Sequence, residues 1–228
     1  MLGYEISRVQ PKAIEKGFNA PYLATLCRPR TVIDVGVGNG TYPLYEAYPK
    51  ADFILVEPLE ECDEVVATVE SRYSCKAYHK AVGRTEGRVE FTVDLDDPEK
   101  SSFETRSRLT SRPHRLVKRS VEVTTLDAIA RNNPRMERPI LLKLDTEGHE
   151  LDALAGATDL LQITDVVISE VSVAKRFEGG YRFEDILLFM KDHDFRFVDI
   201  LAVAHAPGEL GPRHMDVLFM RAADERES

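Results

Sequence analysis

The sequence has few cysteines and no long apolar segment. Cys27, Cys62 and Cys75 are odd in number and form no C-x-x-C pair, which argues against a disulfide framework and a cysteine zinc site. No stretch approaches the roughly 18 apolar residues of a membrane helix. The first residues carry no apolar run of the kind found in secretory signals. We therefore expect reduced thiols, a cytoplasmic location and no membrane partner.

Positive charge is also scarce. The chain has 30 lysine and arginine residues against 39 acidic residues, and its net charge is −9. Binding along nucleic acid or an anionic membrane needs a positive surface, so we expect neither partner. A length of 228 residues is enough for one domain that buries about 70% of the surface of its extended chain. We expect one domain over residues 1–228, with a helical lead-in at 1–30 and a frayed tail at 222–228.

Strand-like and helix-like segments alternate along most of the chain. Short β-branched runs bounded by glycine or proline predict buried strands, and apolar residues at helical spacing between them predict helices. This alternation predicts an α/β fold with a doubly wound, mostly parallel seven-stranded sheet. The last two strands have no helix between them, so we expect an antiparallel C-terminal pair. The seven strands are expected at residues 31–35, 53–56, 75–78, 140–144, 166–171, 197–204 and 215–220.

The region between the third and fourth of these strands follows another pattern. Residues 88–93 alternate in polarity and predict an extra strand, and 121–123 also looks extended. The polar segment 94–118 between them is expected to be a loop, and a basic run extends from Arg106 to Arg119. The loop is either a lid whose basic residues bind an acidic ligand or a solvated, mobile segment.

The most informative stretch is a strand that runs into a glycine loop. Asp34 lies near the end of the first predicted strand, and Gly36, Gly38, Asn39 and Gly40 follow it. Glycine permits positive φ and a close approach of the backbone to a ligand, and the N-terminus of a following helix adds free N–H groups. We expect these five residues to bind a nucleotide-like ligand; the alternative is a tight turn.

An acidic residue ends the second predicted strand. Glu57, which Pro58 follows, lies 17 residues after Gly40 and is placed to accept hydrogen bonds from both hydroxyls of a ribose. With the glycine loop it indicates an adenosyl cofactor, either NAD or S-adenosylmethionine (SAM). The dinucleotide fingerprint needs a glycine where Thr41 stands, and no Tyr-x-x-x-Lys pair occurs. Both observations, together with the antiparallel strand pair, favour SAM.

A second cluster ends the fourth predicted strand. Lys143, Asp145, Glu147, His149 and Glu150 lie within eight residues, and ligands bind at the carboxyl ends of strands in doubly wound folds. The cluster is therefore a site candidate on the same rim as the glycine loop. The alternative is a solvated helix start whose acids favour the helix dipole. Strand alternation puts Lys143 and Asp145 on one face, with Lys143 either in the site or in a buried ion pair.

These motifs resemble those of FkbM-type methyltransferases. The block L-L-K-L-D-T-E-G-H-E-L-D-A-L-A-G-A is similar to the characteristic block of that family, and V-I-D-V-G-V-G-N-G, I-L-V-E-P, V-T-T-L-D-A-I and V-V-I-S-E-V resemble its other motifs in the same order. Val37 and Gly38 depart from the usual D-x-G-A-N-x-G toward the general SAM pattern. The resemblance implies a Rossmann-like class I SAM-dependent methyltransferase that acts on a hydroxyl of a sugar, a polysaccharide precursor or a polyketide-like product.

Roles for single residues follow from this assignment. An alcohol acceptor gains from a base that takes its proton, and Asp145 and Glu147 are the expected catalytic residues. His149 titrates closest to neutrality and is a third candidate. Ala81 and Val82 follow the third strand, where class I methyltransferases commonly contact adenine.

The metal, the acceptor and the enzyme class have alternatives. Asp145 and Glu170 could hold Mg²⁺ at an oxygen-rich rim, but we favour a site without a metal. The acceptor is expected to be a small molecule or a glycan, and an acidic one if the basic run reaches the site. A NAD-dependent reductase on the same sheet and a non-catalytic SAM-binding module are the competing functions.

Overall fold

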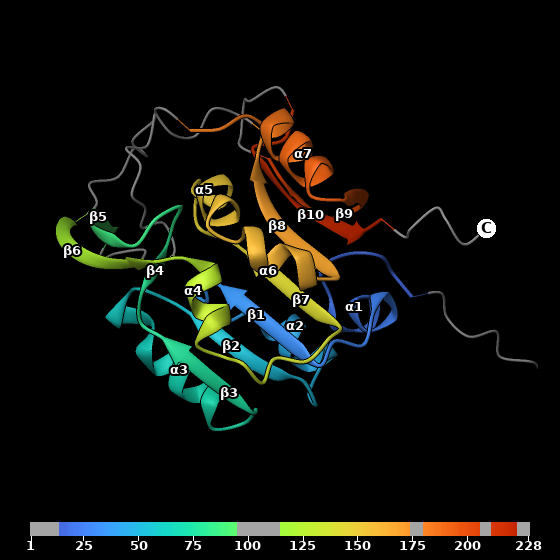
Figure 1. Ribbon diagram of the computed structural model, residues 1–228, viewed down its shortest axis with the longest axis horizontal. Coiled ribbons are helices and arrows are strands. Elements are labelled where there is room, and N and C mark those ends of the chain that lie inside the picture. The colour runs from blue at the N-terminus through green and yellow to red at the C-terminus, as the bar shows by residue number, and fades with distance from the viewer. Residues whose placement is uncertain (1–13, 95–114, 174–179, 206–210, 223–228) are drawn as a thin grey trace, which may run out of the picture.

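The protein is described from a computed structural model, which covers residues 14–94, 115–173, 180–205 and 211–222. Its centre is a seven-stranded sheet with the order β3-β2-β1-β7-β8-β10-β9 (Figure 1). Five strands run parallel, and β10 pairs antiparallel with both β8 and β9. The predicted fold class and the antiparallel C-terminal pair are thus confirmed. The strands are β1 (Thr31–Val35), β2 (Asp52–Val56), β3 (Cys75–Tyr78), β7 (Ile140–Leu144), β8 (Val166–Ser172), β9 (Phe195–Ala204) and β10 (His214–Arg221).

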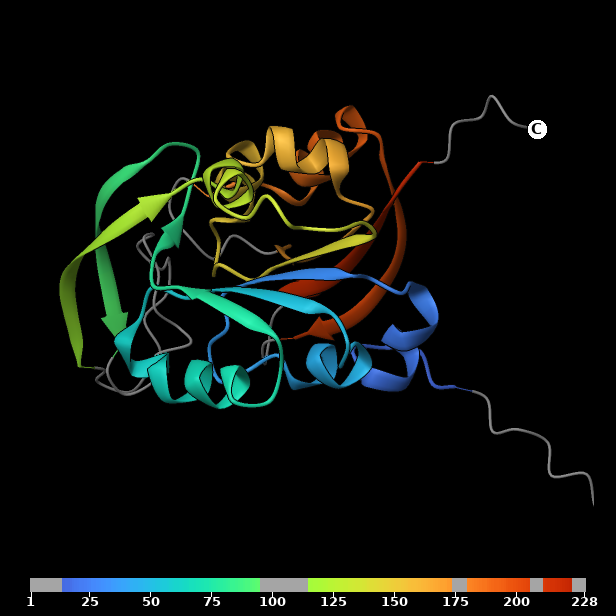
Figure 2. The ribbon, with the colours of Figure 1, turned by 60° about the horizontal axis from the view of Figure 1, so that its bottom comes forward.

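Helices cover both faces of this sheet. Figure 2 shows α1, α2 and α3 along one face and α4 to α7 along the other. Apolar side chains from each helical layer pack against the sheet in two separate clusters. The helices are α1 (Ala20–Leu26), α2 (Tyr42–Ala47), α3 (Asp63–Glu70), α4 (Leu126–Arg131), α5 (Glu150–Ala155), α6 (Thr158–Ile163) and α7 (Phe183–Asp192), and a 3₁₀ turn, η1 (Glu60–Cys62), precedes α3.

The central strands are buried on both faces, which explains their sequence. Every residue of β1, β7 and β8 is buried, and strands covered on both sides read as continuous apolar runs. The three charged exceptions in these strands are Asp34, Lys143 and Glu170. Burial of such groups is costly unless they are paired, so they mark the edge where the site lies.

Local signals set the helix ends. The Asn19 side chain accepts a hydrogen bond from the Tyr22 N–H at the start of α1, and Thr125 accepts one from the Ala128 N–H at the start of α4. Gly156 is the C-cap residue of α5.

The extra strand belongs to a second, smaller sheet. β4 (Ala81–Val82), β5 (Gly87–Asp94) and β6 (Leu116–Thr124) form a three-stranded sheet in the order β4-β6-β5, which lies beside the carboxyl ends of the main strands. The predicted loop 94–118 was too long, because its last three residues already belong to β6. Residues 95–114, with most of the basic run, lie outside the described residues.

The described part of the lead-in packs against β9, at one edge of the main sheet. The Phe18 N–H donates to the Leu201 carbonyl at 3.0 Å, and Lys16 and Tyr22 both bind the Asp199 carboxylate. The N-terminal part of the described chain is thereby tied to β9. Within the described ranges no helix has the length and apolarity to cross a membrane.

Gly156 provides a test of the packing between the end of α5 and the small sheet. A Cβ atom added there would lie 2.2 Å from the Gly83 carbonyl oxygen, whereas one added at Gly87 meets nothing within 4 Å. We expect Gly156→Ala to lower the free energy of unfolding by about 1–3 kcal/mol, because overpacking forces the backbone to move. Gly87→Ala, as the matched control, should cost less than about 1 kcal/mol in urea denaturation. Equal stability of the two variants would contradict the predicted clash.

Candidate active site

The carboxyl ends of β1, β2, β7 and β8 open into one cavity of about 380 Å³. The chain leaves β1 toward β2 and β3 on one side and later returns through β7 to β8 on the other, so the strand order reverses between β1 and β7. Ligands of doubly wound folds bind at such a switch point, and the volume is in the range of small-molecule sites. The predicted residues that line the cavity are Gly36, Gly38, Gly40, Glu57, Pro58, Ala81, Val82, Asp145 and Glu147.

The glycine loop forms the floor under the switch point. Gly36, Gly38 and Gly40 all have positive φ, of 76°, 51° and 99°, a conformation that glycine adopts without strain. A Cβ at Gly36 would lie 1.7 Å from the Asp145 carbonyl oxygen. The first glycine is therefore required by the close packing of the loop after β1 against the end of β7.

A buried ion pair fixes this contact. Lys143 Nζ lies 3.2 Å from Asp34 Oδ1 and 3.6 Å from Asp145 Oδ2, and it donates to the Gly36 carbonyl at 2.7 Å. Burial alone would lower the pKa of Lys143, but the Asp34 and Asp145 carboxylates outweigh it and the pKa is raised. Both interpretations of Lys143 agree with the structure, because it forms the buried ion pair and also lines the cavity.

Asp34 lies behind the cavity lining, whereas the sequence pattern placed it among the ligand-binding residues. It is fully buried, does not line the cavity, and accepts hydrogen bonds from Tyr45 and Thr41 at 2.5 and 3.2 Å. Its carboxylate is thus occupied by the chain itself. Asp34 supports the glycine loop from behind and does not face a ligand.

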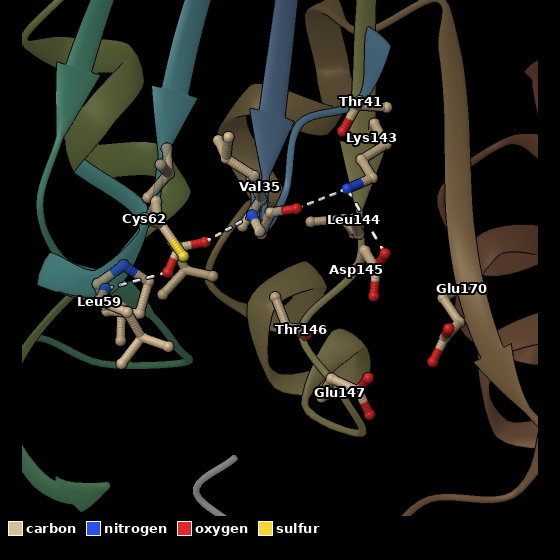
Figure 3. Close-up of a pocket in the computed structure, with 18 of the residues that line it drawn as sticks. Val35, Thr41, Leu59, Cys62, Lys143, Leu144, Asp145, Thr146, Glu147 and Glu170 are labelled. Carbon is tan, nitrogen blue, oxygen red and sulfur yellow. Dashed lines mark hydrogen bonds and ion pairs between the residues drawn. The ribbon is translucent and has the colours of Figure 1, made fainter. Parts of the chain in front are cut away.

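Glu57 lines the cavity at the carboxyl end of β2. Its two carboxylate oxygens accept hydrogen bonds from the Gly38 and Leu59 N–H groups, each at 3.0 Å (Figure 3). Burial raises the pKa of Glu57, while these N–H groups and Lys143 act in the opposite direction. The side chain therefore connects the glycine loop to the end of β2, with Pro58 next to it on the cavity wall.

Two predicted site residues lie away from the cavity lining. Asn39 is not part of it, although the glycines on either side are. His149 also lies outside it: its Nε2 is 3.6 Å from Asp152 and faces Gly83 of the small sheet. Because these contacts lie outside the cavity, we leave His149 out of the site. A sequence pattern could not show this, since the direction of the side chain depends on the turn.

Three carboxylates converge at the other end of the cavity. Single oxygens of Asp145, Glu147 and Glu170 lie within 4.8 Å of one another, and Figure 3 shows them projecting into the same space from the end of β7, the following turn and β8. Glu147 has a φ of 52°, which is uncommon outside glycine. His214 Nε2 lies 3.4 Å from Glu170. Carboxylates in this position can accept a proton from a bound ligand. Their oxygens are also of the type that binds Mg²⁺.

Asp216 is a fourth acid in this region, and sequence analysis missed it. It lies opposite Glu170 in the register of β10 with β8 and lines the cavity. Burial and the charge of Asp145 raise its pKa to about 6, against an opposing effect of Lys143. The available signal was a single acid inside an otherwise apolar strand, but its position beside Glu170 depends on strand register.

The chain matches one protein family and is similar in fold to solved methyltransferase structures. The FkbM methyltransferase domain matches residues 34–197. The fold is similar to magnesium protoporphyrin IX methyltransferase from Synechocystis with bound SAM, with a TM-score of 0.48 and 12% identity over 89% of this chain and 76% of that one. It is also similar to 1,6-didemethyltoxoflavin-N1-methyltransferase from Burkholderia thailandensis, with a TM-score of 0.47 and 12% identity over 90% and 76%. No curated protein matches the chain.

The matching domain makes the protein a SAM-dependent methyltransferase. The family match spans more than half of the chain, and the protein belongs to the FkbM methyltransferase family.

Loss of the buried cation should destabilise the protein. Lys143→Met would leave Asp34 buried without its ionic partner, and we expect a loss of about 3–5 kcal/mol in urea denaturation. Asp34→Asn combined with Lys143→Met should recover part of this loss, because no uncompensated charge remains. Lys50→Met, at an exposed lysine, is the control. A loss for Lys143→Met no larger than that of the control would contradict the ion-pair assignment.

Asp216 should give the stability of the protein a pH dependence. Its pKa is about 6 in the folded protein, against an ordinary value of 3.8 for an exposed aspartate. Between these values the folded protein retains a proton that the unfolded chain has released, so this group lowers stability as pH rises from about 4 to 6. The free energy of unfolding of Asp216→Asn minus that of the wild type should therefore rise by up to about 3 kcal/mol from pH 4 to 7. Parallel pH profiles from urea denaturation would contradict a raised pKa.

Proposed function

We propose that this FkbM-family protein is an O-methyltransferase that transfers the methyl group of SAM to a hydroxyl of a sugar, a polysaccharide precursor or a polyketide-like product. The observation that carries the proposal is the convergence of Asp145, Glu147 and Glu170 in the same cavity as the glycine loop and Glu57. One end of the cavity suits an adenosyl group, and the other end offers carboxylates to a hydroxyl.

The chain offers donors and acceptors that fit the adenosyl group. Glu57 would bind the ribose hydroxyls, Ala81 and Val82 would contact the adenine, and the loop from Gly36 to Gly40 would provide backbone N–H groups and a close approach. Glu57 and the loop are already joined through the Gly38 N–H. The wall is therefore organised before the ligand arrives, which reduces the cost of binding.

The chemistry asked of the protein is modest. SAM supplies a methyl group on a positively charged sulfonium, and the neutral thioether that departs is a good leaving group. The protein therefore mainly has to align the acceptor oxygen. As the oxygen–methyl bond forms and the sulfur–methyl bond breaks, the hydroxyl proton passes to a carboxylate. We assign the orientation of the acceptor to Asp145 and Glu147. Asp216 is a further candidate base, because its pKa of about 6 is nearer neutrality than that of an ordinary aspartate.

The nature of the acceptor is part of the proposal. We propose a small molecule or a glycan in the cytoplasm. Two basic residues of the segment suggested to bind an acidic acceptor, Lys118 and Arg119, pair with Glu90 and Glu61. An acceptor that presents hydroxyl groups to carboxylates fits the described lining better than one that presents an acidic group there.

Ligand binding and turnover test the proposal together. We expect SAM and its demethylated product to raise the melting temperature, because a ligand that binds only the folded state stabilises it, and NAD to have no effect. Glu57→Ala should weaken SAM binding by about tenfold to a hundredfold, the equivalent of losing charge-assisted hydrogen bonds. Glu46→Ala, on the exposed face of α2, is the control. Stabilisation by NAD with indifference to SAM would favour a reductase instead.

Turnover is then measured with labelled SAM and a panel of sugars, sugar nucleotides and polyketide hydroxyls. Asp145→Asn and Glu147→Gln should lower turnover at least about tenfold and leave SAM binding within twofold. Parallel reactions with EDTA and with Mg²⁺ test the carboxylate cluster for a metal, which we expect not to be required, because Lys143 already lies beside Asp145. SAM binding without turnover on any hydroxyl or amine acceptor would favour a non-catalytic module.

A further inference from the structure

A second buried carboxylate organises the turn that carries the catalytic candidates. Glu150, in the first turn of α5, is fully buried. Its Oε1 accepts hydrogen bonds from the Thr146 N–H at 2.9 Å, the Thr146 hydroxyl at 3.1 Å and the Gly148 N–H at 3.0 Å. These donors come from the residues on either side of Glu147. The uncommon left-handed conformation of Glu147 is therefore held by bonds to its two neighbours.

The other oxygen of Glu150 reaches a different part of the chain. The hydroxyl of Tyr181, just before α7, donates a hydrogen bond to Glu150 Oε2. The same hydroxyl accepts the Ser172 N–H at 3.3 Å, and Ser172 lies two residues beyond Glu170 at the end of β8. Tyr181 thus bridges the turn after β7 and the end of β8.

This bridge connects the two elements from which the carboxylate cluster is built. Asp145 and Glu147 come from the turn that Glu150 holds, and Glu170 comes from the strand whose end Tyr181 contacts. Tyr181 is partly buried, and this burial together with the neighbouring Glu150 carboxylate raises the pKa of its hydroxyl. The hydroxyl therefore stays protonated at neutral pH and remains available as a donor to Glu150.

We propose that Tyr181 and Glu150 are positioning residues, which set the separation of Glu147 and Glu170 and thereby align the acceptor hydroxyl. This inference rests on the proposed function. Neither residue lines the cavity, so they act through the carboxylates. The acceptor hydroxyl has to be placed to within about 1 Å, because a misplacement of that size can cost about a hundredfold in rate.

Tyr181→Phe removes the bridging hydroxyl and keeps the ring. We expect the variant to fold and to bind SAM within twofold of the wild type, but to lose about tenfold in kcat for the acceptor. Tyr73→Phe is the matched control, because Tyr73 precedes β3 at the opposite edge of the sheet. Glu150→Gln, which can still accept the bonds of the turn, should lose less kcat than Glu150→Ala. Wild-type kcat in Tyr181→Phe would overturn the proposal.

A measurement without turnover separates this inference from the proposed function. Amide hydrogen exchange at Thr146, Gly148 and Ser172 should become several-fold faster in Tyr181→Phe and stay unchanged in Tyr73→Phe. If the wild type methylates no acceptor, the proposed function fails, and the exchange rates still decide whether the bridge exists. Unchanged exchange at these three amides would overturn the positioning role whatever the activity.

Discussion

The buried ammonium group of Lys143 is the interaction on which the site depends. It contacts the Asp34 carboxylate, the Asp145 carboxylate and the Gly36 carbonyl, which belong to β1, the turn after β7 and the glycine loop. An unpaired charge at this depth would be costly, so each of these groups has its position defined by the need to solvate one cation. The contact of Gly36 with the Asp145 backbone closes the same junction sterically.

Electrostatic balance around this cation extends to the rest of the cavity. Asp145 shares Lys143 with Asp34 and also faces Glu147, Glu170 and Asp216 across the rim. Burial of Asp216 and the charge of Asp145 raise its pKa to about 6, although Lys143 acts in the opposite direction. Asp145, Glu147, Glu170 and Asp216 all line the cavity, whereas His149 does not. Glu150 and Tyr181 hold the geometry from below the turn.

The fold was largely predictable because local patterns were strong and mutually consistent. Buried parallel strands such as β1 and β7 are apolar along most of their length, and the missing helix between β9 and β10 implied the antiparallel pair. The small sheet was only half recognised. Its strands β5 and β6 are exposed to solvent on one side. They pair across about 30 positions of sequence, and a local pattern does not show such a long-range contact. For the same reason the predicted loop extended too far into β6.

The sequence by itself determined the order of the elements, the place of the glycine loop and the location of Glu57 and Asp145 at strand ends. These features follow from backbone conformation and alternation, which are local properties. Only the tertiary structure decided that Asp34 is enclosed by Tyr45 and Thr41, that His149 faces the small sheet, and that Asp216 joins the cavity. Strand register, turn direction and burial decide which side chains meet, and these depend on residues far apart in the chain.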